Sequence, residues 1–320
     1  MQRDIWEIVA LCTADACFLQ VVCVYDEASP IRQSGLVFVS RDNDARIDSK
    51  SCLAVASGPT DVWLSSTGTV WVLSGDGLVF LHGSDPAPVG EPANEAMKVH
   101  ENNHFNNWHG YRLPILTRTQ TPPIPTTLTG FSDNDVFIAT RAGVVLHWDG
   151  AGWEQQECLP VGINELSGPS RDHLWAAGDD GLVARFDGSG WHRHGPLPES
   201  RFEIVTGVRV RDDGRVLACG NKGHIWQGGE EGWSLLGTFP VHFYGMCVVG
   251  GRVLLACGQD GVWTLDGTEV QQVKDSFVAV GCREIGDRAY FVDGDQARVG
   301  PRIIWHDPAA DQAWTATSLG

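Results

Sequence analysis

The sequence lacks any stretch that would cross a membrane or guide export. No run is apolar over the roughly 20 positions that a membrane-spanning helix needs, and no basic start leads into a short hydrophobic core with a cleavage site. The chain also shows no long helical period, and it has only 3 methionines against 38 glycines and 13 tryptophans. These absences predict an all-β protein of the cytoplasm, rich in tight turns, with no membrane partner.

Signatures of catalysis are missing as well. There is no Gly-x-Ser-x-Gly elbow, no Gly-x-x-x-x-Gly-Lys phosphate loop and no His-Glu-x-x-His helix. The segment from His100 to His109 gathers three imidazoles and a carboxylate, but without the spacing that metal ligands need. The sequence therefore predicts a protein that is not an enzyme and holds no metal or cofactor.

The cysteines do not form a disulfide framework. There are nine, an odd number, and no two of them have Cys-x-x-Cys spacing. Most stand among Val, Leu and Ala in expected strands. We interpret them as reduced core thiols, which fits a cytoplasmic location.

What the chain does have is a repeat. Gly143, Gly181, Gly223 and Gly261 are separated by 38, 42 and 38 residues, and each lies between two apolar strands. In the first three units a Trp follows the glycine by ten residues, after an Asp-Gly or Gly-Gly turn; these are Trp153, Trp191 and Trp233. The spacing matches four short strands with their turns, which is the length of one propeller blade.

The same register extends outwards. Gly77 fits it, and Gly35 and Ala297 are the turn positions expected in the first and last units. The 66 residues from Gly77 to Gly143 are too many for one unit, and we interpret residues 84–107 as an exposed loop inserted in a single blade. The sequence thus predicts one domain over residues 1–320: an all-β, seven-bladed β-propeller of four-stranded antiparallel blades in a closed ring.

The repeated pattern Val/Leu-Trp-x-x-Gly-x-Asp-Gly-Leu-Val, followed by Asp-Gly-x-Gly-Trp, resembles the degenerate propeller repeats of bacterial proteins. In architecture these are related to WD-repeat and YVTN-type propellers. The chain lacks the Gly-His opening and Trp-Asp ending of true WD repeats. The resemblance implies a fold and not an activity.

Topology places the candidate binding residues. In a four-stranded blade, the turn between the second and third strands and the connection to the next blade lie on one face. We expect that face to bind a partner through the turn residues Asp76, Arg141, Asp179, Asp180, Lys222 and Asp260. The connections are expected to add Arg201, Phe202, His242, Phe243 and Tyr244. The alternative for Phe202 and Phe243 is that they are partly buried residues wedged between sheets. The pair Asp179-Asp180 is interpreted as turn chemistry rather than as a catalytic dyad, because Asp76 and Asp260 occupy equivalent turns.

Charge narrows the partner class. With 40 acidic and 23 basic side chains the formal net charge is −17, which repels nucleic acid and attracts basic proteins. We interpret the protein as a monomeric, acidic inhibitor or immunity protein that sequesters a basic bacterial toxin. The alternatives are a central-channel hydrolase or lyase acting on a sugar or lactone, and an assembly scaffold.

Overall fold

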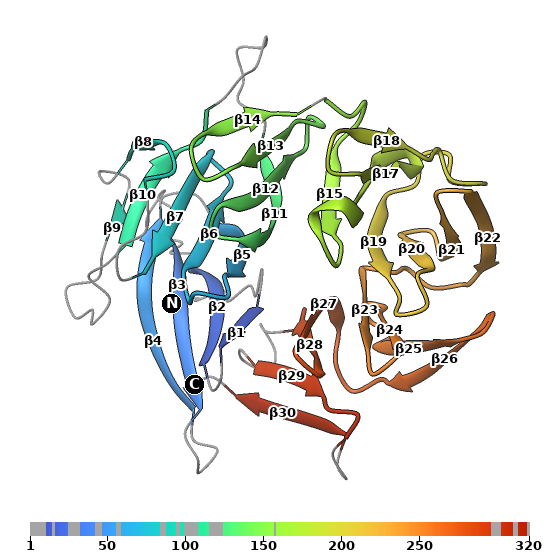
Figure 1. Cartoon of the computed structure of the whole chain (residues 1–320). Helices are drawn as coiled ribbons and strands as arrows, with labels where there is room; N and C mark the ends of the chain where they lie inside the picture. Colours follow the sequence, from blue (N-terminus) through green and yellow to red (C-terminus); the bar gives the residue numbers. More distant parts are fainter. Residues whose placement is uncertain are drawn as a thin grey trace. The chain divides into compact units, whose positions relative to one another are not determined.

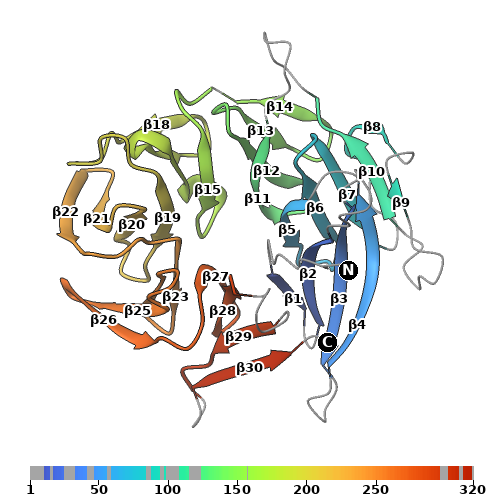
Figure 2. The same ribbon diagram turned by 180° about the vertical axis from the view of Figure 1, so that it is seen from behind.

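A computed structural model describes residues 11–14, 17–24, 33–41, 47–55, 59–83, 88–93, 97–98, 108–114, 124–156, 158–295, 302–309 and 313–318. The chain divides into two compact units. Unit 1 is Met1–Cys158 with Gln296–Pro301 and Leu319–Gly320, and unit 2 is Leu159–Asp295 with Arg302–Ser318. Each unit is a succession of antiparallel sheets (Figures 1 and 2).

The described part of unit 1 contains three sheets. The first has the strand order β1 (Leu11–Ala14), β2 (Cys17–Val24), β3 (Gln33–Arg41), β4 (Ile47–Val55) and β9 (Met97–Lys98). The second has the order β5 (Pro59–Leu64), β6 (Val70–Ser74), β7 (Leu78–His82), β10 (Trp108–Arg112) and β8 (Glu91–Pro92). The third is four-stranded, with β11 (Pro125–Ser132), β12 (Asp135–Thr140), β13 (Val145–Trp148) and β14 (Trp153–Gln155).

The described part of unit 2 contains four sheets, and each has four strands in chain order. The first sheet has β15 (Ile163–Ser167), β16 (Leu174–Gly178), β17 (Val183–Phe186) and β18 (Trp191–Arg193). The second has β19 (Val205–Val210), β20 (Val216–Gly220), β21 (His224–Gly229) and β22 (Gly232–Thr238). The third has β23 (Gly245–Val249), β24 (Arg252–Ala256), β25 (Val262–Asp266) and β26 (Glu269–Lys274), and the fourth has β27 (Ala279–Ile285), β28 (Arg288–Asp293), β29 (Arg302–His306) and β30 (Trp314–Ser318). Two short 3-10 helices, η2 (Arg171–His173) and η3 (Asp179–Gly181), flank β16. The all-β, propeller-like arrangement of antiparallel sheets is confirmed, with four strands in each sheet except the first two of unit 1, where the short strands β9 and β8 add a fifth. The closed seven-bladed ring stays a prediction.

The strands described within the long interval from Gly77 to Gly143 belong to three sheets: β7, β8 and β10 share the second, β9 is in the first, and β11 and β12 are in the third. Strand β10 pairs with β7 across the interval. Within the segment expected to be an exposed loop, β8 pairs with β10 and β9 pairs with β4. The neighbouring Val89 and Ala93 are buried, which explains why residues 88–93 pack against the sheet. The other residues of the segment lie outside the described ranges.

The turn expected at Gly35 is wrong. Gly35 lies inside β3, where it pairs with Val22 on one side and Ala54 on the other. An apolar run over residues 36–39 follows this glycine directly, and both neighbouring strands are long enough to pair across it. The turn expected at Ala297 lies outside the described residues.

The leading glycines of the repeat have the backbone that the turns require. Gly77, Gly143, Gly181, Gly223 and Gly261 all have positive φ, between 70° and 85°. At Gly223, a Cβ atom would lie 2.0 Å from the carbonyl oxygen of Phe239. The repeat therefore uses glycine both for its conformation and for close approach of the outgoing chain.

Buried clusters join the second and third sheets of unit 1 and the consecutive sheets of unit 2. One buried cluster joins β6 and β7 to β11–β13, and others join the sheets of β15, β19, β23 and β27 in turn. The repeated tryptophans occupy equivalent positions, opposite Trp148, Phe186 and Gly228 across their hairpins. Trp191 is buried, whereas Trp153 and Trp233 are half-buried. Their role as packing residues is confirmed.

The expected core thiols are present in unit 2. Cys219, Cys247 and Cys257 are buried and free, and burial raises the pKa of the Cys219 and Cys257 thiols. A thiol with a raised pKa is a poor nucleophile at neutral pH.

Among the described residues, no helix has the length and apolar character to span a membrane.

An aspartate closes the outer hairpin in two of the repeats. The Oδ1 atom of Asp187 accepts hydrogen bonds from the backbone N–H groups of Ser189 (2.8 Å) and Gly190 (3.0 Å). Asp149 does the same for Ala151 and Gly152. The Ser189 hydroxyl, followed by these backbone bonds, lowers the pKa of Asp187.

This turn predicts an acid-dependent loss of stability. A carboxyl group whose folded-state pKa is lowered contributes stability above its unfolded pKa of about 3.9, and that contribution is lost as pH falls towards the folded-state value. We expect the melting temperature of the natural protein to fall between about pH 5 and pH 2. Asp187→Asn, which keeps the turn's acceptor, should flatten that part of the profile. Equal slopes for the two proteins in thermal melts would contradict this reading.

Candidate binding face of unit 2

The first strands of the four sheets in unit 2 are neighbours. Contacts join β15 to β19, β19 to β23 and β23 to β27, and Figures 1 and 2 show their order. The turn between the second and third strands lies at the end where the next sheet's first strand begins. For example, the N–H of Gly181, in the β16–β17 turn, donates to the carbonyl oxygen of Glu203, just before β19 (2.9 Å). The topology expected from the sequence is therefore confirmed within this unit.

Apolar side chains are exposed at this end of unit 2. Phe202 is 69% exposed, Tyr244 49%, Ile204 41% and Val280 37%. They stand just before β19, just before β23 and at the start of β27. We call these four residues the apolar face. The fifth large apolar residue exposed in the described part of the chain is Ile124, just before β11 in unit 1.

Backbone and side-chain contacts link the segments that carry the apolar face. The Thr206 hydroxyl of β19 donates to the carbonyl oxygen of Phe243 (2.8 Å), beside Tyr244. The Tyr244 ring lies over Gly258, where a Cβ would come within 2.7 Å of it. Gly258 in turn pairs with Ala279, next to Val280. The segments that carry the apolar face are thus linked across three sheets, and the described residues leave its four side chains exposed.

The loop before β19 is held firmly. The buried carboxylate of Glu203 accepts hydrogen bonds from the Lys222 backbone N–H (3.0 Å) and from the His224 ring. The backbones of Ile204 and Asn221 are linked by a further bond (3.0 Å). Phe202 and Ile204 are therefore presented on a pre-organised loop, which lowers the entropic cost of binding.

Most of the unit 2 residues expected at this face lie there. Asp180, Arg201, Lys222, His242 and Asp260 are exposed. The Lys222 ammonium donates to the carbonyl oxygen of Arg201 (2.8 Å). Asp179 is half-buried and accepts a hydrogen bond from the Asn164 amide (3.0 Å). The face carries charges of both signs around its apolar centre.

Three sequence-predicted residues have other settings. Phe243 is 1% exposed and packs on Phe239, with ring centroids 6.3 Å apart, so its expected role as a surface contact is wrong. Asp76 and Arg141 belong to unit 1, in its β6–β7 and β12–β13 turns. Both are exposed, and Asp76 accepts a hydrogen bond from the Ser74 hydroxyl (2.6 Å).

A pocket of about 410 Å³ opens beside Phe202. We call it the Phe202 pocket; its other lining residues are Asp180, Pro196, Leu197, Glu199, Ser200 and Arg201. Asp180, Glu199 and Phe202 have φ values of 52°, 61° and 57°, and no other non-glycine residue described has positive φ. Such a backbone costs about 1–2 kcal/mol per residue and is concentrated at binding sites.

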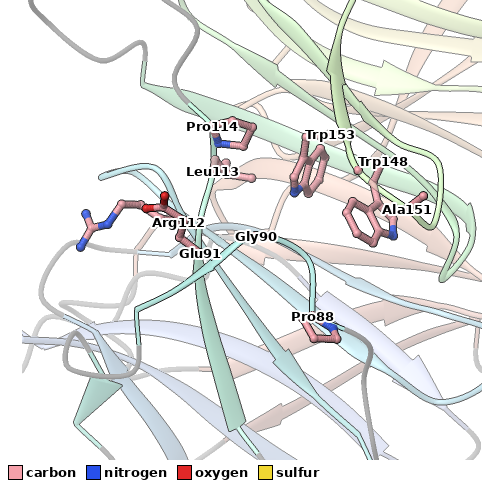
Figure 3. A pocket seen from close by; sticks show the side chains of 10 residues that line it. Pro88, Gly90, Glu91, Arg112, Leu113, Pro114, Trp148, Ala151 and Trp153 are labelled. Atoms are coloured by element: carbon pink, nitrogen blue, oxygen red, sulfur yellow. The ribbon is translucent and has the colours of Figure 1, made fainter.

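A larger pocket, of about 690 Å³, lies in unit 1 between β10 and the β13–β14 hairpin. Figure 3 shows the indoles of Trp148 and Trp153 on one side of it and Arg112, Leu113 and Pro114 on the other. The two indole centroids are 5.6 Å apart. The Trp153 ring N–H donates to the carbonyl oxygen of Val89. This aromatic wall gave no sequence signal beyond the repeated tryptophan.

Three of the first strands of unit 2 also share an ionic cluster around the buried Arg209. Arg209 on β19 donates to Glu165 on β15, and its Nε atom lies 3.6 Å from Glu284 on β27. Burial favours the neutral guanidine, but the two carboxylates more than offset this, and the pKa of Arg209 is raised. Burial raises the pKa of Glu165 despite the neighbouring charge of Arg209.

In the described residues, no group of three or more His, Cys, Asp or Glu side chains is arranged to hold a metal ion.

Neither the protein-family models nor the curated protein sequences contain a match to this chain. Solved structures do match it. Virginiamycin B lyase from Staphylococcus aureus, in a catalytically inactive form with quinupristin, has a TM-score of 0.64 at 11% identity, covering 91% of this chain and 93% of that one. The WD40 β-propeller domain of Doa1 has a TM-score of 0.63 at 12% identity, with 91% of each chain covered.

A third similar structure is YCF48 bound to D1 peptide, with a TM-score of 0.60 at 14% identity and 91% of each chain covered. Similar propellers thus include a lyase, a WD40 domain and a peptide-bound protein. At these identities the likeness shows the fold, which is that of a β-propeller.

Proposed function

We propose that this protein is a non-enzymatic binding propeller that sequesters another protein through the apolar face of unit 2. The observation that carries the proposal is the set of four exposed apolar side chains on three adjoining sheets. Exposed apolar patches with polar and charged rims are typical of protein-binding sites. Arg and aromatic residues, which this face combines in Arg201, Phe202 and Tyr244, are enriched among interface hot spots.

The more specific proposal is an inhibitor or immunity protein for a basic bacterial toxin. Its support is the net charge of −17, which speeds association with a basic protein. The proposal includes three further features: the blades close into a seven-bladed ring, the protein works in the cytoplasm, and the chain is a monomer. A peptide-bound propeller among the similar structures is compatible with protein binding as a use of the fold.

The second candidate is a hydrolase or lyase acting on a sugar or lactone. What favours it is the likeness to two lyase structures, that of virginiamycin B lyase and that of streptogramin B lyase. An assembly scaffold is the third class, and it differs from the first in having several partners.

Affinity capture from the native host, followed by mass spectrometry, separates these functions. We expect one partner, at a stoichiometric amount and with a basic isoelectric point, that is released as salt is raised. Several partners of comparable amount would indicate a scaffold. Absence of any partner, together with turnover of a cyclic ester or glycoside, would contradict the proposal and support the enzyme.

A further inference from the structure

The Phe202 pocket has an apolar wall and an acidic rim. Its wall is formed by Pro196, Leu197 and the Phe202 ring. Asp180 and Glu199 are exposed at the rim, and neither carboxylate has a hydrogen-bond or ion-pair partner among the described residues. The pocket therefore offers both apolar surface and unpaired negative charge.

The cationic side chains near the pocket already make contacts of their own. The Arg201 guanidinium lies over the Phe202 ring, 4.8 Å from the ring centroid, and its carbonyl oxygen accepts the Lys222 ammonium. Arg201 is thus a stacked cation on one side of the ring. Among the residues that line the pocket, two carboxylates stand against this one cation, and Lys222 lies outside the lining, so a cationic group is the better match for the pocket.

The lining is also fixed in place. The Ser200 hydroxyl donates to the carbonyl oxygen of Leu197 (2.5 Å), and the Leu197 N–H donates to Gly181 (3.1 Å). The Trp226 ring N–H donates to the carbonyl oxygen of Pro198 (2.7 Å). The positive-φ residues Asp180, Glu199 and Phe202 are therefore held by bonds from both sides of the pocket.

We propose that the Phe202 pocket takes one lysine or arginine side chain of the basic partner. The methylene stem packs on Pro196, Leu197 and the ring of Phe202, and the charged head lies between Asp180 and Glu199. Lysine and arginine bury their stems along apolar surface while their heads stay at a polar rim. This inference rests on the proposed function, because it identifies the chemistry of the partner at the same face.

The test uses small probes and needs no partner. N-acetyl-lysine amide and N-acetyl-arginine amide are titrated into the ¹⁵N-labelled protein, with N-acetyl-norleucine amide as the uncharged probe of matched stem. We expect saturable shifts of the amide signals of residues 196–203 for at least one cationic probe, at about 1–10 mM, and binding at least about tenfold weaker for norleucine.

Two charge variants sharpen the test. Asp180→Asn with Glu199→Gln keeps side-chain size and, at position 180, a residue that tolerates positive φ. It should weaken cationic-probe binding about tenfold or more. The control, Asp212→Asn with Glu231→Gln, removes two exposed carboxylates at the opposite end of the β19–β22 sheet and should leave binding unchanged. Unchanged melting temperatures and amide spectra show that both variants fold.

The outcomes distinguish the inference from the proposed function. No saturable shift for either cationic probe up to about 50 mM, or equal binding of norleucine, overturns the inference. A captured partner whose affinity is insensitive to Asp180→Asn with Glu199→Gln also overturns it, while leaving the proposed function standing. If a cationic probe binds and these substitutions abolish its binding, the inference is supported even where no protein partner is captured. The lack of a captured partner counts against the proposed function alone.

Discussion

Replacing Phe202 with Asn and Tyr244 with Ala is expected to weaken partner binding about 100- to 1,000-fold. Each residue has the exposure of an aromatic hot spot, and truncation of such a residue costs about 2 kcal/mol or more. Asn is chosen at position 202 because it tolerates the positive φ there. The affinity is measured by calorimetry with the captured partner.

The control for this variant is Asp212→Ala with Glu231→Ala, at the opposite end of the β19–β22 sheet. It should bind within about threefold of the natural protein, because these side chains lie away from the apolar face. Melting temperatures should stay within about 4 °C of the natural protein for both variants. Equal affinities of the face variant and the control would remove the apolar face from the binding site.

Arg209→Met is expected to destabilise the fold by about 3–5 kcal/mol. The Arg209 side chain is 9% exposed, and it bonds Glu165 and approaches Glu284. Removing it leaves the Glu165 carboxylate, whose side chain is only 22% exposed, without its ion-pair partner, which is the costly way to break such a pair. Urea unfolding of the two proteins measures the difference.

The pH dependence of that difference identifies its cause. Without Arg209, the pKa of Glu165 should rise further in the folded state. A group whose folded pKa is raised stabilises the fold at low pH and loses that contribution as pH rises through the folded value. The deficit of Arg209→Met should therefore shrink from about pH 8 to about pH 5. A constant deficit would point to lost packing, and a deficit below about 1 kcal/mol would show that Glu165 is solvated.

The repeat made most of the fold predictable. Glycines with positive φ are nearly obligatory at tight turns, so the spacing of Gly143, Gly181, Gly223 and Gly261 located the turns between second and third strands. Across the long interval, the segment from Trp108 to Pro114 resembles the strand start at Trp191, and this likeness indicates the strand that the structure shows as β10. Gly35 misled because a glycine within a strand looks the same in sequence as a glycine in a turn.

The candidate site was only partly predictable. Topology located Phe202 and Tyr244, and the alternation of sides along an extended segment explains why Phe243 is buried between two exposed neighbours. Ile204 and Val280 were missed because an apolar residue at the end of a strand resembles core in sequence. The ionic cluster of Glu165, Arg209 and Glu284 joins three different sheets, and no local pattern carries such a contact.

Hydrogen exchange of the protein with and without its captured partner tests the central claim most directly. Binding at the apolar face should slow exchange in residues 200–206, 242–246 and 278–282, and leave the turns at 211–215 and 250–252 unchanged. Protection confined to those opposite turns, or to the outer strands β18, β22 and β26, would contradict a binding site on the apolar face of unit 2.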